Sequence, residues 1–540
     1  MAYYKDFREY LDTLEAAGKL RRVQRPTNKD TELHPLVAWQ FRGLNEAQRT
    51  GFLFENVTDS QGKRYNCRVA TATIAPSREV YALGMKCAPD GINEKWWEAH
   101  ERPVPPRLVE TGPVKEEIHK GDKLLEHGGV KEFAIPITGN GWESLPRLTA
   151  VCWHTKDPET GVINVGTYNG YLQGPDRTSC RTSRGRSHLG IQFEKCRQRG
   201  IPLQAAAVIG AGPAISMLGV SRVPYHVSEL DIAGGIAGEP IEVVKCETID
   251  MVVPANAEIV IEGEIPTDWE EPDAASVETF GHVMIDLKVF AFKVKCITHR
   301  RNPIWHDLNI QTPPSEDTTI LSFYTSQQLT RFLRESCEIP QVKNVVYYPH
   351  DMAIIRMQDI KGERTPNSVV WQALLASQAR SDFEPRIVIA VDEEIDPWDL
   401  ETVFWAIMNR CQPHRDIRII QGRGAFGHPG YQTAGPLGMD PEQKRFPTSW
   451  TGPQGQSSLL IDSTRKWDYT PVGLPKRPYM ERAKEIWEEL GFPPLYLREP
   501  WYGVSLGIWP EKYQRWAELA EKGEFEQAAR ELMEGGKHIT

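Results

Sequence analysis

The chain is organised around a stretch that begins Ile163-Asn164-Val165-Gly166-Thr167-Tyr168-Asn169, continues through Ser187-His188-Leu189-Gly190 and ends at Ser228-Glu229. Three residues of this stretch, Asn164, His188 and Glu229, offer an amide oxygen, an imidazole nitrogen and a carboxylate. Such ligands suit a hard or borderline divalent ion such as Mn²⁺, Mg²⁺ or Fe²⁺. Because the chain contains 14 His and 73 acidic residues, residue types alone favour polar groups that are simply satisfied by hydrogen bonds.

Composition limits the class of protein. A length of 540 residues suggests about two to four domains, and 40% hydrophobic with 25% charged residues is typical of a soluble globular protein. The net charge of −10 argues against a nucleic-acid or anionic-membrane partner, and no apolar run is long enough to span a bilayer. Nine scattered cysteines without a Cys-x-x-Cys pair, and a start without a signal peptide, predict reduced thiols and a cytoplasmic protein.

The hydrophobic pattern divides the chain into four predicted parts. Residues 1–120 form an α/β segment whose first helix is capped by Asp6 and ended by Gly18. Residues 121–325 contain short runs rich in Val and Ile between Gly, Pro and Asn, which is typical of an antiparallel sheet or barrel. In residues 326–478 strands alternate with helices, which indicates an α/β domain. Residues 479–540 form a helical tail, whose Leu519, Phe525 and Leu532 could dock on another part of the protein or another subunit.

Two glycine-rich segments have competing interpretations. Residues 422–427 spell G-x-G-x-x-G after a predicted strand, but His428-Pro429-Gly430 prevents the helix that a dinucleotide site requires. We therefore predict a long surface loop there, of the kind that active sites use as lids. Residues 233–238, Ala-Gly-Gly-Ile-Ala-Gly, predict a tight turn, with close approach of the backbone to a ligand as the alternative.

Six cations lie near His188 in the sequence: Arg177, Arg181, Arg184, Arg186, Lys195 and Arg197. The simplest explanation is a solvated loop. The alternative is a phosphate cradle, because guanidinium forks bind phosphate oxygens in pairs. A phosphate bridged to a metal ion at the proposed ligands would lie close to such a cluster.

Several short motifs together resemble one family. They are Asn164-x-Gly166-x-Tyr168, Ser187-His188, Ser228-Glu229, Glu242-Val243-Val244-Lys245-Cys246, Glu262-Gly263-Glu264-Ile265-Pro266, Ile297-Thr298-His299-Arg300-Arg301 and Pro313-Pro314-Ser315-Glu316-Asp317. Spread over most of the chain, they identify it as a member of the UbiD family of decarboxylases. The resemblance implies a central flavin-binding domain built on an antiparallel split β-barrel, which fits the predicted α+β and α/β multidomain organisation.

The resemblance also implies a cofactor, prenylated FMN, whose phosphate is held through a divalent metal, usually Mn²⁺ with Fe²⁺ or Mg²⁺ as alternatives, and a K⁺ ion. Asn164, His188 and Glu229 stand where the family has its divalent-metal ligands, and K⁺ is expected at Val165, Leu218, Gly219, Ser221 and Glu229. The other positions along the implied cofactor cleft are Gly166, Thr167, Tyr168, Asn169, Arg184, Gly185, Arg186, Ser187, Leu189 and Gly190. The flavin would take up the electrons as CO₂ leaves an aromatic or α,β-unsaturated acid, so the difficult chemistry belongs to the cofactor.

Two reacting positions depart from the family pattern. The family has an arginine five residues after the Asn ligand, where this chain has Asn169. The family's Glu-Gly-Pro-Tyr/Phe-Gly-acid motif corresponds to residues 277–282, Val-Glu-Thr-Phe-Gly-His, so His282 replaces the protonating acid. Glu278 is shifted by one position, which in an extended strand would point it to the opposite face unless the loop bulges. We therefore predict Asn169, His282 and Glu278 as catalytic residues, with His282 or a bulged Glu278 as proton donor.

The departures leave function and substrate open. The first expectation is an active, reversible, non-oxidative carboxy-lyase acting on an aromatic acid, for example an ortho-carboxylated aromatic acyl-CoA, with a phenolic or cinnamic-type acid next. The alternatives are a non-catalytic subunit of a carboxylase complex and a flavin reductase-like protein with plain FMN. The resemblance further implies a homo-oligomer, a dimer to a hexamer, and a flavin prenyltransferase as partner for cofactor supply.

Overall fold

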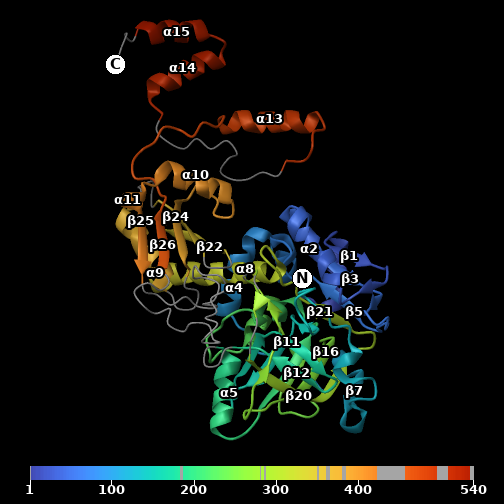
Figure 1. Cartoon of the computed structure of the whole chain (residues 1–540). Coiled ribbons are helices and arrows are strands. Elements are labelled where there is room, and N and C mark those ends of the chain that lie inside the picture. The colour runs from blue at the N-terminus through green and yellow to red at the C-terminus, as the bar shows by residue number, and fades with distance from the viewer. Residues whose placement is uncertain are drawn as a thin grey trace. The chain divides into compact units, whose positions relative to one another are not determined.

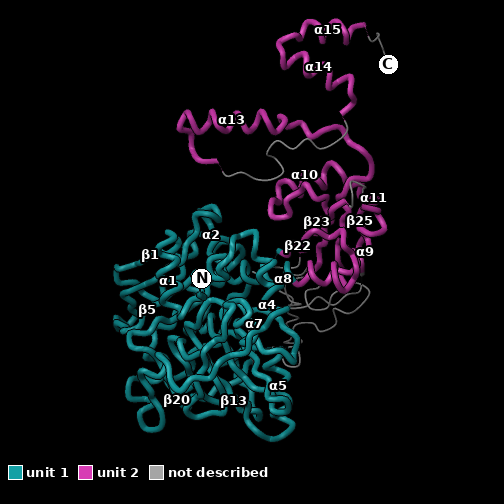
Figure 2. Tube along the Cα trace, turned by 180° about the vertical axis from the view of Figure 1, so that it is seen from behind, with its two compact units in different colours: residues 1–327, 348–350 teal, residues 328–347, 351–540 magenta. Residues whose placement is uncertain are grey.

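In the computed structural model, the chain forms two compact units (Figures 1 and 2). Unit 1 contains residues 1–327 and 348–350, and unit 2 contains residues 328–347 and 351–540. The structure describes residues 2–182, 187–279, 281, 283–284, 288–348, 352–359, 365–379, 385–421, 457–495 and 509–534. The expected boundaries near residues 120, 325 and 478 stay predictions.

The N-terminal part of unit 1 is a small α/β layer, as predicted. Helix α1 (Phe7–Ala16) begins after Asp6, whose carboxylate accepts from the Glu9 backbone N–H at 2.9 Å. The four-stranded sheet of this layer has the order β1 (Leu20–Val23), β3 (Gly51–Phe54), β5 (Arg68–Thr71) and β21 (Ile304–Asp307). Because β21 pairs in parallel with β5, the chain returns to this layer after building the central sheet. Helices α2 (Leu33–Gly43), α3 (Arg78–Met85) and α4 (Ile92–Glu101) complete this part of the chain.

The centre of unit 1 is a ten-stranded antiparallel sheet, so the predicted fold class is confirmed. Its path is β10 (Ile163–Thr167), β9 (Cys152–Lys156), β13 (Leu203–Ile209), β16 (Ile259–Ile265), β20 (Lys288–His299), β12 (Arg177–Cys180), β11 (Gly170–Gly174) and β8 (Arg147–Leu148), with β7 (Glu117–Lys120) and β17 (Glu271–Pro272) paired to β20. The buried side chains of these strands form one core with residues of the N-terminal layer, including Trp153, Phe292 and Trp305. Burial of this apolar surface is the main force that stabilises the unit.

Three helices after the sheet strands carry the residues singled out by the sequence: α5 (His188–Gln198), α6 (Pro213–Gly219) and α7 (Glu229–Ala237). The tight turn predicted at residues 233–238 is therefore wrong, because most of that segment is helical. A Cβ on Gly234 would lie 2.2 Å from the Val104 carbonyl oxygen, and one on Gly235 would lie 2.6 Å from that of Ala99. The glycines thus serve close packing of α7 against the end of α4 and the chain that follows it.

The remaining pairings in unit 1 are small. A three-stranded sheet has the order β15 (Val252–Pro254), β14 (Glu242–Lys245) and β6 (Arg107–Leu108), and two further pairs join β2 (Thr27–Asn28) to β4 (Val57–Thr58) and β18 (Ser276–Val277) to β19 (Val283–Met284). Helix α8 (Glu316–Arg331) follows β21. The β18–β19 hairpin matters most here, because it carries the predicted catalytic segment.

Unit 2 has the predicted α/β character, with the sheet order β22 (Val342–Tyr348), β23 (Met352–Met357), β24 (Ile387–Asp392), β26 (Ser457–Asp462) and β25 (Ile417–Gln421). Strands β23, β24 and β26 are parallel, and β25 is antiparallel to β26. Its helices are α9 (Asn367–Ala379), α10 (Leu400–Arg410) and α11 (Pro413–Asp416), and the tail contains α13 (Arg477–Glu489), α14 (Glu511–Glu521) and α15 (Phe525–Glu534). The G-x-G-x-x-G segment at 422–427 lies outside the described residues.

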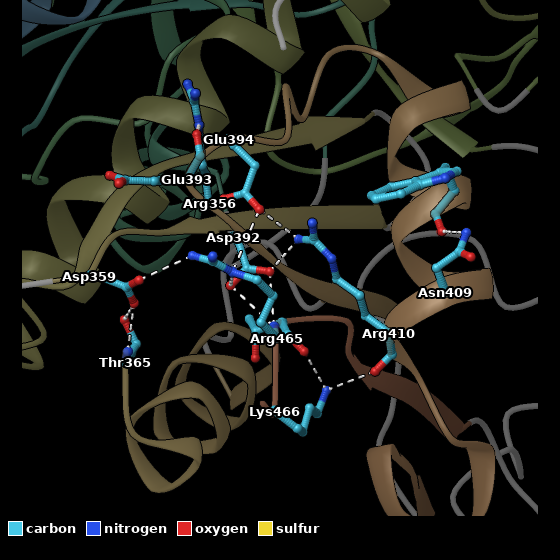
Figure 3. A network of polar contacts seen from close by, with 12 residues as sticks. Arg356, Asp359, Thr365, Asp392, Glu393, Glu394, Asn409, Arg410, Arg465 and Lys466 are labelled. Atoms are coloured by element: carbon cyan, nitrogen blue, oxygen red, sulfur yellow. Dashed lines mark hydrogen bonds and ion pairs between the residues drawn. The ribbon is translucent and has the colours of Figure 1, made fainter. Parts of the chain in front are cut away.

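Charged side chains close the carboxyl ends of the parallel strands in unit 2 (Figure 3). Arg410 at the end of α10 binds Glu394 at 2.9 Å and also contacts Asp392, the last residue of β24. The Arg465 backbone N–H donates to Asp392 at 2.9 Å, and its guanidinium binds Asp359 at 3.2 Å. Because each acid is paired, we interpret this network as a structural lock for the sheet rather than a ligand site.

Candidate active site

Two helix N-termini and one strand meet at the predicted metal ligands. Asn164 lies on β10, His188 is the first residue of α5, and Glu229 is the first residue of α7. Each helix is capped by the serine before it, since the Ser187 hydroxyl accepts from the Gly190 N–H at 3.0 Å and the Ser228 hydroxyl from the Leu230 N–H at 3.4 Å. Helix N-termini carry partial positive charge and free N–H groups, so this corner suits a phosphate as well as a metal.

The structure brings His188 and Glu229 together, while the use of all three side chains as metal ligands stays a prediction. His188 Nδ1 lies 3.8 Å from Glu229 Oε1, and the Val165 backbone N–H donates to Glu229 Oε2 at 2.7 Å. The Asn164 amide hydrogen-bonds the hydroxyl of Tyr168, whose pKa is raised by its own burial and by the nearby charge of Glu229. Asn164 and Glu229 themselves are only 4% and 3% exposed. An amide, an imidazole and a carboxylate at these positions fit a hard or borderline divalent cation.

Because the Glu229 carboxylate is buried, a positive charge beside it would stabilise its ionised form. Loss of solvation raises the pKa of Glu229 to about 8, although the hydrogen bond from Val165 opposes the shift. Burial, followed by repulsion from Arg222, lowers the pKa of His188. The imidazole is therefore held in the neutral form that binds metals, while the carboxylate lacks a compensating charge. A divalent cation would supply that charge.

The raised pKa of Glu229 makes a prediction about metal-free protein. The folded state holds the carboxyl proton more tightly than the unfolded chain, whose ordinary glutamate pKa is 4.5. The contribution of this group to stability is therefore complete below that value and is lost as pH rises through about 8. Thermal unfolding over this range should show a falling melting temperature, and saturating Mn²⁺ should restore most of it at the alkaline end. An equal fall in a Glu229→Gln variant would contradict this origin.

Three of the five residues expected to hold K⁺ lie at or just after the C-terminus of α6. Leu218 and Gly219 end α6, and the Ser221 backbone N–H donates to the Leu218 carbonyl at 2.8 Å. A Cβ on Gly219 would lie 2.5 Å from the Thr167 hydroxyl, so the carbonyl end of α6 sits directly against β10. Helix C-termini carry partial negative charge and favour cations. The K⁺ assignment to Val165, Leu218, Gly219, Ser221 and Glu229 stays a prediction.

A second buried cluster contains two arginines and two glutamates. Glu278 is paired with Arg181 and also lies 3.6 Å from Arg147 Nη2, while Arg147 Nη1 binds Glu143 at 2.8 Å. Arg147, Glu143 and Glu278 are 0%, 7% and 6% exposed. The family's glutamate–arginine pattern is absent at its usual positions, but the structure assembles the same residue types from β8, the end of β12 and the β18–β19 hairpin.

Glu278 is buried and lies at a turn, so it is not part of a regular strand, which is the alternative that the sequence left open. Its carbonyl accepts from the Gly281 N–H at 2.8 Å, and Gly281 has a φ of +81°, so a tight turn begins at Glu278. Burial alone would raise the pKa of Glu278, but Arg181, Arg147 and the 2.6 Å hydrogen bond from Ser276 together lower it. Glu278 is therefore ionised at neutral pH and poorly suited to donate a proton. His282 lies outside the described residues.

Asn169 connects the two clusters through the backbone. It follows the strand that carries Asn164, and its carbonyl accepts from the Arg181 N–H at 2.7 Å. The arginine that contacts Glu278 thus comes from position 181, directly after β12, and not from position 169. Arg181 was missed as a partner of Glu278 because 97 residues separate the two in the sequence. The signal that was present, a cluster of cations, pointed instead to phosphate.

The described part of the proposed phosphate cradle consists of cations with carboxylate partners. Among its six cations, four have carboxylate partners, in the pairs Arg177–Glu271, Arg181–Glu278, Lys195–Asp157 and Arg197–Glu194. Arg177, Lys195 and Arg197 are held by local ion pairs, whereas Arg181 pairs with Glu278 through Nη2 and leaves Nη1 without a hydrogen-bond partner among the described residues. Arg184 and Arg186, with Gly185 between them, lie outside the described residues, so their assignment to the cofactor stays a prediction.

Asp317, part of the family motif at residues 313–317, was not predicted as a site residue. It lies in the first turn of α8 and is 9% exposed. Burial raises its pKa to about 7, with a hydrogen bond from Ser315 opposing the shift, and the charges of Arg147 and Glu278 both act on it. Its Oδ2 atom is buried without a hydrogen-bond partner among the described residues. Neighbouring Glu316 differs, because its carboxylate accepts backbone N–H groups of Ile74, Ala75 and Asn309.

Other sequence predictions concern the chain as a whole. All nine cysteines are free thiols, as expected. Among the described residues, none of the helices combines the length and apolarity needed to cross a membrane.

Comparison with known proteins identifies the family of the chain. Residues 131–313 match the family model described as the 3-octaprenyl-4-hydroxybenzoate carboxy-lyase Rift-related domain, and residues 318–435 match the C-terminal domain of the same carboxy-lyase. A phenolic acid decarboxylase of Bacillus subtilis (strain 168) is 27% identical over 491 residues, covering 87% of this chain and 99% of that protein.

Solved structures give the same result. The UbiD-class enzyme HmfF from Pelotomaculum thermopropionicum, in complex with FMN, has a TM-score of 0.72 and 30% identity, covering 87% of this chain and 95% of that one. An evolved dimeric form of HmfF in complex with prFMN has a TM-score of 0.72 and 29% identity, covering 87% and 97%. The chain belongs to the UbiD family. It is accordingly a carboxy-lyase.

Proposed function

We propose that this protein is a prenylated-FMN-dependent decarboxylase of an aromatic carboxylic acid, and that the reaction is reversible. The observation that carries the proposal is the buried Glu229 carboxylate beside His188, at the meeting point of two capped helix N-termini. Its support is that this corner fits a metal-linked phosphate, within a family that includes an enzyme solved with prFMN. When bound, the flavin would supply the electron sink for loss of CO₂.

Residues at two helix N-termini and at the end of α6 would hold the cofactor and its ions. Asn164, His188 and Glu229 would hold Mn²⁺, or Fe²⁺ or Mg²⁺, and the carbonyl end of α6 would hold K⁺ beside β10. The N-termini of α5 and α7 would face the flavin phosphate with free N–H groups. Leu189 and Gly190, both buried in the first turn of α5, would form the wall behind the phosphate.

The arginine–glutamate cluster would handle the substrate. Arg181 Nη1 is buried without a hydrogen-bond partner among the described residues, although the other side of the same guanidinium contacts Glu278. This free donor suits a substrate carboxylate, because guanidinium groups bind carboxylates through two N–H groups. Glu278 would hold Arg181 in place, and Asp317, with a pKa of about 7, is a better proton donor at neutral pH than ionised Glu278.

The arginine also bears on substrate class. The expectation of an ortho-carboxylated aromatic acyl-CoA depended on the loss of the family arginine, and Arg181 restores a guanidinium next to Glu278. A free aromatic acid is therefore favoured over the acyl-CoA. Phenolic acids are an example, since the Bacillus subtilis relative is named a phenolic acid decarboxylase. A substrate panel that contains free aromatic acids and aromatic acyl-CoA thioesters can compare the two classes directly.

The cofactor and the substrate require separate tests. Mass spectrometry of the extracted cofactor should show prenylated FMN in protein co-produced with a flavin prenyltransferase, and anaerobic protein should release CO₂ from phenolic acids. Unmodified FMN in fully active protein would favour the reductase-like alternative. If no aromatic acid or acyl-CoA loses CO₂ or exchanges labelled CO₂, the non-catalytic subunit becomes the better interpretation. Size measurement of the same sample tests the expected homo-oligomer.

A further inference from the structure

A group of metal-ligating side chains lies outside the site described above. His119 comes from β7, Glu132 ends the 3-10 helix η5 (Gly129–Glu132), and His299 ends β20. His119 Nδ1 lies 3.4 Å from Glu132 Oε2, and His299 Nε2 lies 3.8 Å from Glu132 Oε1. One nitrogen or oxygen atom from each residue lies within 4.8 Å of those of the other two. Ligands of a single tetrahedral Zn²⁺ lie about 3.3 Å apart, so small rotamer changes would bring these atoms to one ion.

These atoms are buried and lack other partners. His119 and His299 are 8% and 5% exposed. His119 Nδ1, His299 Nε2 and Glu132 Oε2 have no hydrogen-bond partner among the described residues. Buried polar atoms that are left unsatisfied cost about 1–3 kcal/mol each, so a cluster of three requires an explanation.

A second-sphere hydrogen bond prepares His299 for metal binding. Its Nδ1 lies 2.8 Å from the Arg300 carbonyl oxygen. Because a carbonyl can only accept, Nδ1 carries a proton. Burial lowers the pKa of His299 and so favours the neutral imidazole, in which Nε2 presents its lone pair toward Glu132. A lone pair that faces an ionised carboxylate is repulsive unless a cation lies between them. Metal-binding histidines usually donate their other ring N–H to a carbonyl or carboxylate in this way.

We propose that His119, Glu132 and His299 form a binding site for Zn²⁺ or a similar borderline divalent metal, separate from the predicted cofactor metal. Two imidazoles and one carboxylate are ligands that Zn²⁺ uses, and they differ from the oxygen-rich sets of Mg²⁺ and Ca²⁺. The exposed His127, whose ring centre lies 4.9 Å from that of His119, adjoins the site. A metal here would join β7, η5 and the end of β20.

The packing around the site supports a structural role. The Phe133 ring contacts His299 edge-on at 5.5 Å and stacks on the core residue Trp305 at 6.1 Å. Burial raises the pKa of Glu132 and lowers the pKa of His119, which makes neutral forms easier to hold without a metal. A bound cation would reverse this preference for Glu132 and stabilise the folded chain.

The test uses full-length protein stripped of metal and titrated with Zn²⁺, or with Co²⁺ as a spectroscopic probe of imidazole ligation. A Glu229→Gln background weakens the cofactor-metal corner, so the remaining binding reports this site. We expect Zn²⁺ to raise the melting temperature of that protein, and Glu132→Gln or His299→Ala to weaken binding by ~10²-fold or more. Glu132→His should restore affinity, because it returns a ligand.

The controls separate ligation from misfolding. Glu132 is partly exposed and its glutamine variant keeps side-chain volume, so its metal-free melting temperature should stay near that of the parent. His414→Ala, which removes an exposed histidine in unit 2, should bind Zn²⁺ like the parent. The proposal is overturned if the Glu229→Gln protein binds no Zn²⁺, or if Glu132→Gln and His299→Ala both retain parental affinity.

Discussion

Replacing Glu229 with glutamine is expected to yield folded protein that retains neither flavin nor the divalent metal of the cofactor site. The substitution keeps side-chain volume and an oxygen that can accept from the Val165 N–H, which lies 2.7 Å from Glu229 Oε2. It removes the negative charge of the proposed metal set and leaves His188 and Asn164 as neutral ligands. Loss of a carboxylate ligand should weaken metal binding by ~10²-fold or more. Flavin absorbance and metal analysis of the purified protein measure the result, and His188→Ala should change both in the same direction.

The matched control lies in the same helix turn. Asp231 is the second acidic residue in the first turn of α7 and is half-buried, so Asp231→Asn makes the same change of charge near the same helix N-terminus. If only the helix dipole matters, the two variants will lose cofactor to similar extents. We expect Asp231→Asn to keep parental flavin and metal. Normal occupancy of both in Glu229→Gln would remove the metal assignment.

The residues of the proposed metal corner were placed by the family resemblance, because residue types alone do not distinguish metal ligands from ordinary polar groups. Ser187-His188 and Ser228-Glu229 each combine a helix cap with a proposed ligand. Strand β10 carries Asn164, and the next residue, Val165, donates its backbone N–H to the Glu229 carboxylate. The β-rich centre and the α/β alternation of unit 2 could be predicted from the residues themselves, since both have strong hydrophobic periods. These features depend on residues a few positions apart.

Helix α7 shows where local reasoning failed. Gly234 and Gly235 suggested a turn, because glycine destabilises an isolated helix by ~1 kcal/mol relative to alanine. In the folded protein their missing Cβ atoms allow Val104 and Ala99 to approach the helix. Tertiary packing therefore outweighs the local preference, and a single sequence carries no sign of which segment will pack there.

The arginine–glutamate cluster was beyond sequence reasoning for a different reason. Arg181 and Glu278 meet because β12 pairs with β20 and the β18–β19 hairpin precedes β20 in the chain. That pairing is a property of the whole sheet. The inward orientation of Glu278 further depends on a turn at Gly281, which a strict alternation of strand faces does not predict.

The second large effect is expected at Arg181. Arg181→Gln removes the guanidinium that pairs with Glu278 and offers a free buried N–H group to the substrate carboxylate. Turnover should fall by ~10²-fold or more, the range seen when one preorganised electrostatic group is lost at a reacting centre. Flavin and metal content should stay normal, because the metal corner uses other residues. Single-turnover CO₂ release from enzyme loaded with prenylated FMN measures the effect.

Two comparisons decide whether Arg181 acts as proposed. Arg177→Gln changes another arginine of the same hairpin, whose partner Glu271 lies 3.2 Å away at a more exposed position, and it should leave turnover near the parental value because exposed ion pairs contribute little. Glu278→Gln should lower turnover as well, and the double variant should lose much less than the product of the single losses, since the two residues act as one unit. If Arg181→Gln instead loses flavin at unchanged turnover per bound cofactor, Arg181 belongs to the phosphate cradle, and its role toward the substrate carboxylate is excluded.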